Sequence, residues 1–323
     1  MQKTVSVINL NNLRRNALFV RGILKGRKFY AVVKADGYGH GGAEVARAVE
    51  DIADGFCVAI VDEGVRLRLA GIVKPIIVLT PPLDFDDIAR IRLYDLTPSV
   101  NSVKTAKLIS GTPCHIQVNT GMNRLGCNIT ELPKLLKTLS REQIVGVYSH
   151  MYNPSSAEDS DAQLRLFNSA EELVKCKNPN AIAHLAASGG LLSGDKYLKD
   201  GGRCGILLYG YPPEGFKAAV KPVLTVYARR TQITKFIGGG AGYARANRTY
   251  KNLGCYRLGY ADGFMRTVPL GENNLCMDAF LKEGGGEYER VLSDAAEYAK
   301  RCGTIAYEVL CSATRRSLKI YEG

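Results

Sequence analysis

The chain has 323 residues, of which 46% are hydrophobic and 23% are charged. These proportions are ordinary for globular proteins and exclude a chain that is disordered throughout. Lysine and arginine outnumber aspartate and glutamate by 43 to 31, which gives a formal net charge of +12. We expect no membrane span, because no stretch approaches the roughly 18 consecutive apolar residues that a spanning helix requires.

The nine cysteines are spread along the chain without a C-x-x-C pair, and the four histidines are isolated. This spacing does not favour a metal site. The N-terminal residues lack the apolar core of a secretory signal. The odd cysteine count and the length of the chain therefore predict reduced thiols in a cytoplasmic protein rather than a disulfide framework.

A net charge of +12 is compatible with nucleic-acid binding, but the basic residues form no block longer than a pair and no aromatic residues interleave with them. We therefore expect no nucleic-acid partner. Two interpretations remain. The charge forms an ordinary basic surface, or part of it creates a positive field that gathers an anionic ligand.

Short, almost continuously apolar runs recur along the first two thirds of the chain, as expected for strands that are buried on both faces. Most are separated by helical patterns, which predicts a (β/α)8 barrel over roughly residues 10–215. An open Rossmann-type sheet is the alternative, but no G-x-G-x-x-G follows the first strand. The predicted strands are Phe29–Lys34, Gly55–Ile60, Pro75–Leu79, Leu96–Val100, His115–Thr120, Val145–His150, Ile182–Ser188 and Cys204–Tyr209.

The predicted helices of this part are Ala43–Ile52, Glu63–Ala70 and a long helix over Asp159–Cys176. After Pro213 the pattern changes to strands with glycine-rich turns, Lys221–Ile237 and Gly254–Tyr260. One further helix is predicted over Tyr288–Cys302. We therefore expect a barrel domain over residues 1–215 and a smaller, mostly β domain over residues 216–323.

Polar residues that follow barrel strands are candidates for the site, because active sites of such barrels lie at the carboxyl ends of the strands. Lys34 ends the first predicted strand, where burial lowers the pKa of an amine and favours nucleophilic attack. Emergence of Lys34 into solvent is the alternative. Ser188 and Arg203 follow at the seventh and eighth strands, where barrels often bind phosphate. A lysine combined with a phosphate site suggests pyridoxal phosphate.

The chain also resembles the alanine racemases, which are pyridoxal phosphate enzymes with a barrel and a β domain. Residues 29–41 (FYAVVKADGYGHG) resemble the cofactor-lysine motif, and residues 259–263 match G-Y-A-D-G. Weaker matches follow in the family's order. They are residues 119–126 (NTGMNRLG), 149–150 (SH), 184–188 (HLAAS), 203–210 (RCGILLYG) and 276–278 (CMD).

This resemblance implies a two-base reaction on a small amino acid in a homodimer with a shared active site. Lys34 would hold the cofactor and act as one acid or base. Tyr260 of the partner subunit would be the second base, on the opposite face of the substrate. A tyrosine has an ordinary pKa of about 10, so it needs nearby positive charge to act as a base. A packed aromatic side chain is the alternative for Tyr260.

The resemblance also assigns binding roles. Arg203 would face the ring nitrogen of the cofactor and keep it unprotonated, because arginine stays charged. His150 would support Arg203, or would be a structural histidine; His40 and His184 are expected to be structural. Arg124 and the backbone N–H of Met277 would bind the substrate carboxylate. The residues that would hold the phosphate are Tyr38, Ser188, Gly205 and Ile206.

Several positions depart from the family pattern. Gln117 stands where many members carry a modified lysine, and Asn119 replaces an aspartate, so two potential anions near Arg124 are neutral. A chloride ion or a direct amide hydrogen bond would be the substitute. Arg315 stands where a tyrosine normally touches the phosphate. The segments after Gly263 and after Asp278 are shorter than in the family.

The leading interpretation is an alanine racemase that supplies D-alanine for peptidoglycan. Serine or another small amino acid is the alternative substrate, since a small pocket rejects one extra hydroxyl poorly. A cofactor-binding paralogue with little catalysis is the second alternative. The shortened domain and the neutral residues Gln117 and Asn119 favour it, whereas retention of both Lys34 and Tyr260 disfavours it.

Overall fold

The computed structural model describes residues 4–272 and 275–323. Residues 1–3 of the N-terminal segment, and residues 273–274 of the short link expected after Gly263, lie outside the described part of the chain. Two compact units are present. One, the barrel unit, contains residues 13–37 and 42–220, and the other, the sheet unit, contains the described residues of 1–12, 38–41 and 221–323.

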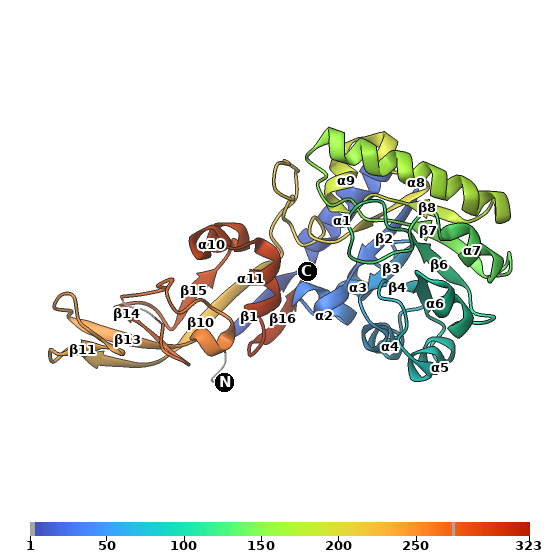
Figure 1. The fold of residues 1–323 in the computed structure, drawn as a ribbon. Helices are drawn as coiled ribbons and strands as arrows, with labels where there is room; N and C mark the ends of the chain where they lie inside the picture. Colours follow the sequence, from blue (N-terminus) through green and yellow to red (C-terminus); the bar gives the residue numbers. More distant parts are fainter. Residues whose placement is uncertain (1–3, 273–274) are drawn as a thin grey trace. The chain divides into compact units, whose positions relative to one another are not determined.

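Eight parallel strands form the barrel unit in the order β8-β7-β6-β5-β4-β3-β2-β9 (Figure 1). Backbone hydrogen bonds from Asp200 to Ala183 (3.0 Å) and from Arg203 to Ala186 (2.9 Å) join the two ends of this order. The sheet is therefore a nearly closed barrel, and the predicted fold class is confirmed. The strands are β2 (Lys28–Val32), β3 (Gly55–Val58), β4 (Ile76–Val78), β5 (Thr97–Val100), β6 (Cys114–Gln117), β7 (Ile144–Tyr148), β8 (Ile182–His184) and β9 (Gly201–Cys204).

Helices connect these strands and bury one apolar side each. The long helix α8 buries Phe167, Ala170 and Val174, which lie on one stripe at helical spacing. Its first turn is capped by the side chain of Ser156, which accepts from the backbone N–H of Asp159. The helices are α1 (Leu10–Leu24), α3 (Gly42–Val49), α4 (Val61–Leu69), α5 (Phe85–Leu93), α6 (Val103–Leu108), α7 (Leu132–Lys137), α8 (Ala157–Lys177), α9 (Ser188–Ser193) and the short η1 (Asp195–Tyr197).

The eighth strand begins earlier than its apolar run suggests. The strand is Gly201–Cys204, whereas most of the predicted stretch, from Gly205 to Tyr209, forms turns. At Gly201 the neighbouring strand approaches so closely that a Cβ would lie 2.6 Å from the carbonyl oxygen of Lys28. The apolar side chains of the turn are buried without belonging to a strand, so an apolar run alone placed the strand wrongly.

A six-stranded sheet forms the framework of the sheet unit, in the order β14-β13-β10-β1-β16, with β15 also paired to β10. The long strand β10 pairs antiparallel with β1, β13 and β15. A separate two-stranded ribbon joins β11 and β12. The strands are β1 (Val5–Asn9), β10 (Leu224–Lys235), β11 (Gly240–Ala241), β12 (Ala244–Arg245), β13 (Asn252–Arg257), β14 (Phe280–Glu283), β15 (Tyr288–Leu292) and β16 (Leu318–Glu322).

The division between the units differs from the expected boundary at residues 215 and 216. The chain passes into the sheet unit after Val220, and the N-terminal strand β1 also belongs to that unit. β1 pairs antiparallel with β10 and parallel with β16. The sequence pattern of a single strand does not reveal which distant strand it will pair with. For this reason residues 5–9 fell within the predicted barrel domain.

The helix predicted over Tyr288–Cys302 is only half correct. Residues Tyr288–Leu292 form strand β15, and helix α10 begins at Ala295. The side chain of Asp294 accepts from the backbone N–H groups of Ala296 (2.8 Å) and Glu297 (3.2 Å), which fixes the start of the helix. A second helix, α11 (Ala306–Ser312), follows α10 (Ala295–Cys302) and was not predicted.

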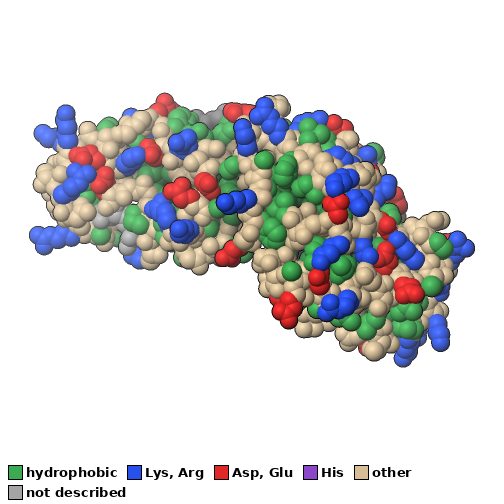
Figure 2. Space-filling model, turned by 90° about the horizontal axis from the view of Figure 1, so that it is seen from above, with side chains coloured by type: hydrophobic (Ala, Val, Ile, Leu, Met, Phe, Trp, Pro, Cys, Tyr) green, Lys and Arg blue, Asp and Glu red, His purple; other side chains and the backbone are tan. Residues whose placement is uncertain are grey.

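Charged side chains do not gather on the face of the molecule shown in Figure 2, where lysine and arginine (blue) are scattered among aspartate and glutamate (red). Within the described residues, no helix combines the length and the apolar composition needed to cross a bilayer. All nine cysteines are free thiols, and four of them (Cys57, Cys114, Cys127 and Cys204) are buried.

Candidate active site

Lys34 follows strand β2 at the start of a left-handed backbone turn, labelled α2 (Lys34–Tyr38) in Figure 1. Ala35 and Asp36 both have φ 53°, and Gly37 has φ 62°. The backbone N–H of Ala35 donates to the carboxylate of Glu63 at 2.7 Å, and the Asp36 carboxylate accepts from the N–H of Gly42 at 2.9 Å. These contacts hold a conformation that L-residues seldom adopt, as occurs often at functional sites.

The amine of Lys34 lies in a positive environment. Burial lowers its pKa, and the guanidinium of Arg124 lowers it further, while the carboxylate of Glu63 opposes them. Arg203 contributes in the same direction as Arg124. Lys34 is half-buried rather than extended into solvent. An amine with a lowered pKa is more often neutral and hence nucleophilic.

Arg203, on strand β9, is 2% exposed and is held by neutral acceptors. One guanidinium nitrogen, Nη1, donates to the ring nitrogen Nδ1 and to the carbonyl oxygen of His184, both at 2.7 Å. The other, Nη2, donates to the carbonyl oxygen of Ser149 at 2.5 Å. The guanidinium also lies 4.9 Å from the ring centroid of Tyr148. Within the described residues, no aspartate or glutamate forms an ion pair with this buried cation.

His150 contacts Arg203 as expected, with its Nδ1 at 3.4 Å from Nη2. Burial lowers the pKa of His150 to about 3, and the charges of Arg203, Arg124 and Lys34 act in the same direction. His184 was expected to be structural, yet it contacts Arg203 directly. Its own pKa is lowered well below the ordinary value, first by burial and then by Arg203 and His115. Both histidines are therefore neutral at pH 7.

Ser188 and the turn that follows β9 come together as predicted. The hydroxyl of Ser188 accepts from the backbone N–H of Gly205 at 3.1 Å and lies 3.5 Å from that of Leu207. Ser188, Gly205 and Ile206 are all buried. A hydroxyl and neighbouring backbone N–H groups are the donors that barrel enzymes use for phosphate at this edge.

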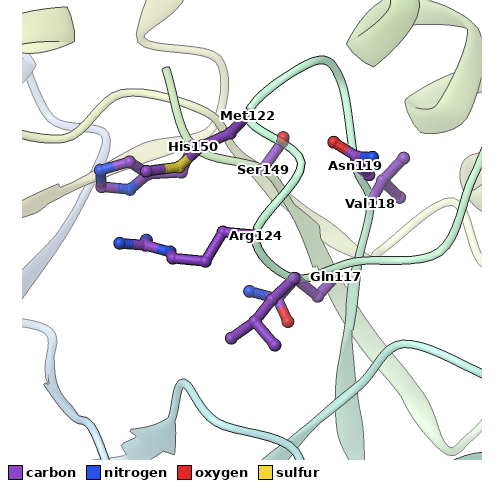
Figure 3. Close-up of a pocket in the computed structure, with 8 residues that line it drawn as sticks. Gln117, Val118, Asn119, Met122, Arg124, Ser149 and His150 are labelled. Atoms are coloured by element: carbon purple, nitrogen blue, oxygen red, sulfur yellow. The ribbon is translucent and has the colours of Figure 1, made fainter. Parts of the chain in front are cut away.

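A small, open pocket lies at the carboxyl ends of strands β6 and β7. Its lining includes Gln117, Arg124, Ser149 and His150. Figure 3 shows the Arg124 side chain between His150 and Gln117, with the amide of Asn119 apart from it. No described residue accepts a hydrogen bond from the Arg124 guanidinium, so of the two substitutes expected, a chloride ion or a direct amide hydrogen bond, the amide contact is absent.

The two neutral residues near Arg124 have different surroundings. Asn119 shapes its own loop, because its Oδ1 accepts from the N–H groups of Gly121 (3.1 Å) and Asn123 (3.0 Å). Gln117 is buried, and within the described part of the chain its Oε1 has no hydrogen-bond partner. Arg124 is exposed. The guanidinium is therefore available to an anionic ligand that enters the pocket.

The other predicted site residues belong to the sheet unit. Tyr260 starts the short helix η2 (Tyr260–Asp262), and its backbone N–H donates to the carbonyl oxygen of Cys276 at 3.1 Å. The N–H of Ala261 donates to the carbonyl oxygen of Met277 at 3.0 Å. Tyr260 and Met277 are thus carried by two backbone segments that are bonded to each other, and both side chains are exposed.

Tyr38 and Arg315 also lie in the sheet unit. Tyr38 is buried, and its ring centroid is 6.0 Å from that of Tyr307. Arg315 is exposed, whereas its neighbour Arg316 forms ion pairs with Asp278 (2.7 Å) and Asp262 (3.4 Å). The predicted site residues therefore fall into two groups: Lys34, Arg124, His150, Ser188, Arg203, Gly205 and Ile206 in the barrel unit, and Tyr38, Tyr260, Met277 and Arg315 in the sheet unit.

Four residues in or around the candidate site were not predicted from the sequence to contribute to it: Glu63, His115, His184 and Arg316. His184 stands within the family motif of residues 184–188 and in a predicted barrel strand, which was a usable indication of a role near Arg203. His115 stands in a predicted strand and Arg316 in a pair of basic residues, and neither pattern indicates which side chain the residue contacts. Glu63 opens a predicted helix, where an acidic residue is expected for helix stability alone.

The barrel matches a known family over most of its length. Residues 8–213 match the family described as "Alanine racemase, N-terminal domain". The chain belongs to the alanine racemase family. The alanine racemase of Carboxydothermus hydrogenoformans is 31% identical over an alignment of 375 residues that covers 99% of this chain and all of that protein.

Solved alanine racemases share the fold. That of Clostridium difficile 630 has a TM-score of 0.89 at 26% identity and covers 100% of this chain and 96% of its own. That of Bartonella henselae, solved with covalently bound pyridoxal phosphate, has a TM-score of 0.84 at 24% identity, covering 99% of each chain.

Proposed function

We propose that this chain interconverts L- and D-alanine with pyridoxal phosphate as its cofactor. The observation that carries the proposal is a cluster of three cations, Lys34, Arg124 and Arg203, that form no ion pair with any described aspartate or glutamate, although Arg203 is buried. Uncompensated buried charge is costly. A phosphorylated cofactor and an amino-acid carboxylate supply the missing negative charge.

The donors present fit pyridoxal phosphate. Lys34 offers an amine of lowered pKa for the cofactor aldehyde. Arg203 would face the ring nitrogen, and its fixed charge would keep that nitrogen unprotonated. Tyr38, Ser188, Gly205 and Ile206 would hold the phosphate, and Arg315 would take the place of the tyrosine that touches the phosphate in the family. When bound, the cofactor withdraws electrons from the substrate and makes its Cα–H acidic.

Proton transfer at Cα would be divided between two residues. Lys34 would remove or return the proton on one face of Cα, and Tyr260 of the partner subunit would act on the opposite face. Arg124 and the backbone N–H of Met277 would hold the substrate carboxylate, so that the Cα–H stays aligned with the two bases. His150 would keep Arg203 in place.

The proposal includes a homodimer, because Tyr260 is assigned to the neighbouring subunit's site. It also includes a cytoplasmic location and a purpose, the supply of D-alanine for peptidoglycan. Free thiols at all nine cysteines are compatible with a reducing compartment. Sedimentation of the purified protein tests the oligomeric state directly.

Deuterium incorporation at Cα tests the reaction. In D2O, wild-type protein should introduce deuterium into both enantiomers of alanine and racemise them. Lys34→Ala should abolish tight cofactor binding and hence all exchange. Tyr260→Phe should keep the absorption of the bound cofactor near 420 nm but lose racemisation, because one face of Cα has no base.

The same assay separates the alternatives. A panel of small amino acids, with serine first, distinguishes an alanine racemase from one of broader specificity. A yellow protein that exchanges no Cα proton in any of them would be a cofactor-binding paralogue. The neutral residues Gln117 and Asn119 beside Arg124 are the observation that keeps this second candidate under test.

A further inference from the structure

A chain of hydrogen bonds continues from Arg203 into the core of the barrel. Nη1 of Arg203 lies 2.7 Å from Nδ1 of His184, and Nε2 of His184 lies 2.8 Å from Nδ1 of His115. All three side chains are buried, at 2%, 0% and 4% exposure respectively. This series of hydrogen bonds therefore runs from the candidate site to His115 of strand β6, which does not line the pocket.

The direction of donation along this chain is fixed by chemistry. A guanidinium nitrogen only donates, so Nδ1 of His184 must accept. The neutral ring of His184 then carries its proton on Nε2, from which it donates to Nδ1 of His115. Burial, aided by the charge of Arg203, lowers the pKa of His115 to about 3, so His115 is also neutral and carries its proton on its own Nε2.

The fold makes room for His115. Its strand partner in β7 is Gly146, and a Cβ at position 146 would lie 2.2 Å from Nδ1 of His115. Tyr148 stacks on His184, with ring planes 10° apart and centroids 5.1 Å apart. The ring of Tyr30 lies 5.2 Å from that of His184. The two imidazoles are thus confined to one arrangement by the strands around them.

We infer that His115 is a positioning residue for Arg203, because it holds His184 in the one tautomer that accepts from the guanidinium. Without an acceptor at position 115, the Nε2 proton of His184 has no partner in a dry core, and the other tautomer becomes favourable. That tautomer directs an N–H at the N–H of Arg203. The guanidinium would then lose a contact that fixes its orientation. This inference rests on the proposed role of Arg203 beside the cofactor.

Nitrogen-15 magic-angle-spinning NMR of protein labelled at histidine tests the tautomers without any turnover. The chain has only four histidines, so single substitutions assign the signals. In the wild-type protein as purified, both His184 and His115 should be protonated at Nε2 and unprotonated at Nδ1. A proton on Nδ1 of His184 would overturn the inference outright, whatever the variants do.

A matched pair of variants tests the effect on the site. In His115→Asn the amide oxygen can occupy the place of Nδ1 and accept from His184, whereas His115→Leu has no acceptor. We expect His115→Asn to keep the single tautomer of His184 and nearly wild-type racemisation. His115→Leu should give mixed tautomers, an altered absorption spectrum of the bound cofactor and a kcat lower by about tenfold, the effect of one lost buried hydrogen bond.

The outcomes are distinguishable. Equal behaviour of the two variants, in tautomer and in kcat, would reject a positioning role for His115. Wild-type protein that neither binds the cofactor nor exchanges Cα protons would instead reject the proposed function, and the NMR result would still decide the hydrogen-bond chain. If His115→Leu does not fold, His115→Asn and the wild-type tautomers remain decisive.

Discussion

The backbone beside Lys34 is strained at single residues that are not glycine. Ala35 and Asp36 occupy the left-handed region, which disfavours an L-residue by roughly 1–2 kcal/mol. Gly37 occupies the same region without this penalty, and a Cβ there would also approach Gly42 to 3.2 Å. Tyr38, with φ 52°, occupies this region as well, so the turn contains one position that suits its residue and three that do not.

Substitution at these positions should change stability in opposite directions. Ala35→Gly relieves the left-handed strain and should raise the free energy of unfolding by roughly 1 kcal/mol, partly offset by the greater freedom of glycine in the unfolded chain. Gly37→Ala should lower it by at least a similar amount. Urea denaturation of both variants against wild type measures these changes. Stabilisation by Gly37→Ala would show that the turn does not require a left-handed residue.

Lys34, Ser188 and Arg203 could be predicted from the sequence, because each stands next to a strand of a pattern that already indicated a barrel. The left-handed turn could not, since Ala35 has no preference for that conformation and an aspartate adopts it only occasionally. The contact between His184 and His115 depends on strands that are distant in the sequence. Sequence spacing does not indicate that their side chains meet in the barrel core.

Two turns of the sheet unit, residues 259–263 and 276–279, are joined by one side chain. Arg316 pairs with Asp278 of one turn and with Asp262 of the other. Asp262 in turn accepts from the backbone N–H of Gly259 at 2.8 Å. A Cβ at position 259 would lie 2.2 Å from the carbonyl oxygen of Met277, so the turns touch through their backbones.

Substitution of Arg316 should therefore lower the rate of racemisation more than it lowers the stability of the fold. The side chains of Arg316 and Asp278 are 41% and 54% exposed, and exposed ion pairs add little to folding. Arg316→Gln should lower racemisation several-fold with little change in thermal unfolding, because Tyr260 and Met277 lose a shared support. Arg316→Lys is the conservative control. Asp278→Asn should have a similar effect, and the double variant should not be additive.

Two of the errors in the predicted elements arose where a tertiary contact decides the structure. The apolar residues Ile206–Tyr209 satisfy a strand pattern, but the strand lies earlier, where Gly201 allows a neighbouring strand to approach. Residues Tyr288–Leu292 fit a helical spacing but pair with β10. The cap at Asp294 was visible in the sequence, because an aspartate three residues before Glu297 is typical of a helix start.

The buried histidines make the stability of the molecule sensitive to acid. The pKa of His115 is about 3 when folded and about 6.5 when unfolded, so the unfolded state binds a proton first as the pH falls. The stability contributed by the neutral His115 is therefore fully present well above pH 6.5 and is lost progressively as the pH falls from about 6.5 to about 3. At pH 5 His115 should lower the free energy of unfolding by about 2 kcal/mol, and His184 acts in the same direction.

Urea denaturation at pH 7 and at pH 5 measures this loss. The window lies above the range in which carboxylates titrate, so histidine dominates the change. His115→Asn should show a shallower dependence than wild type, because one of the protonating groups is absent. A free energy of unfolding that stays constant from pH 7 to pH 5 would contradict the assignment of neutral, buried imidazoles.

The pairing of β1 with β16 has a consequence for the order in which the molecule is made. Neighbouring barrel strands lie close together in the sequence, so most of the barrel can form while synthesis proceeds. Strand β1 is synthesised early, yet its partners β10 and β16 follow only much later, with Val5 opposite Leu318. During that interval β1 presents unpaired backbone groups to other nascent chains. Strand β1 can therefore complete its hydrogen bonding only after the last residues of the chain have been synthesised.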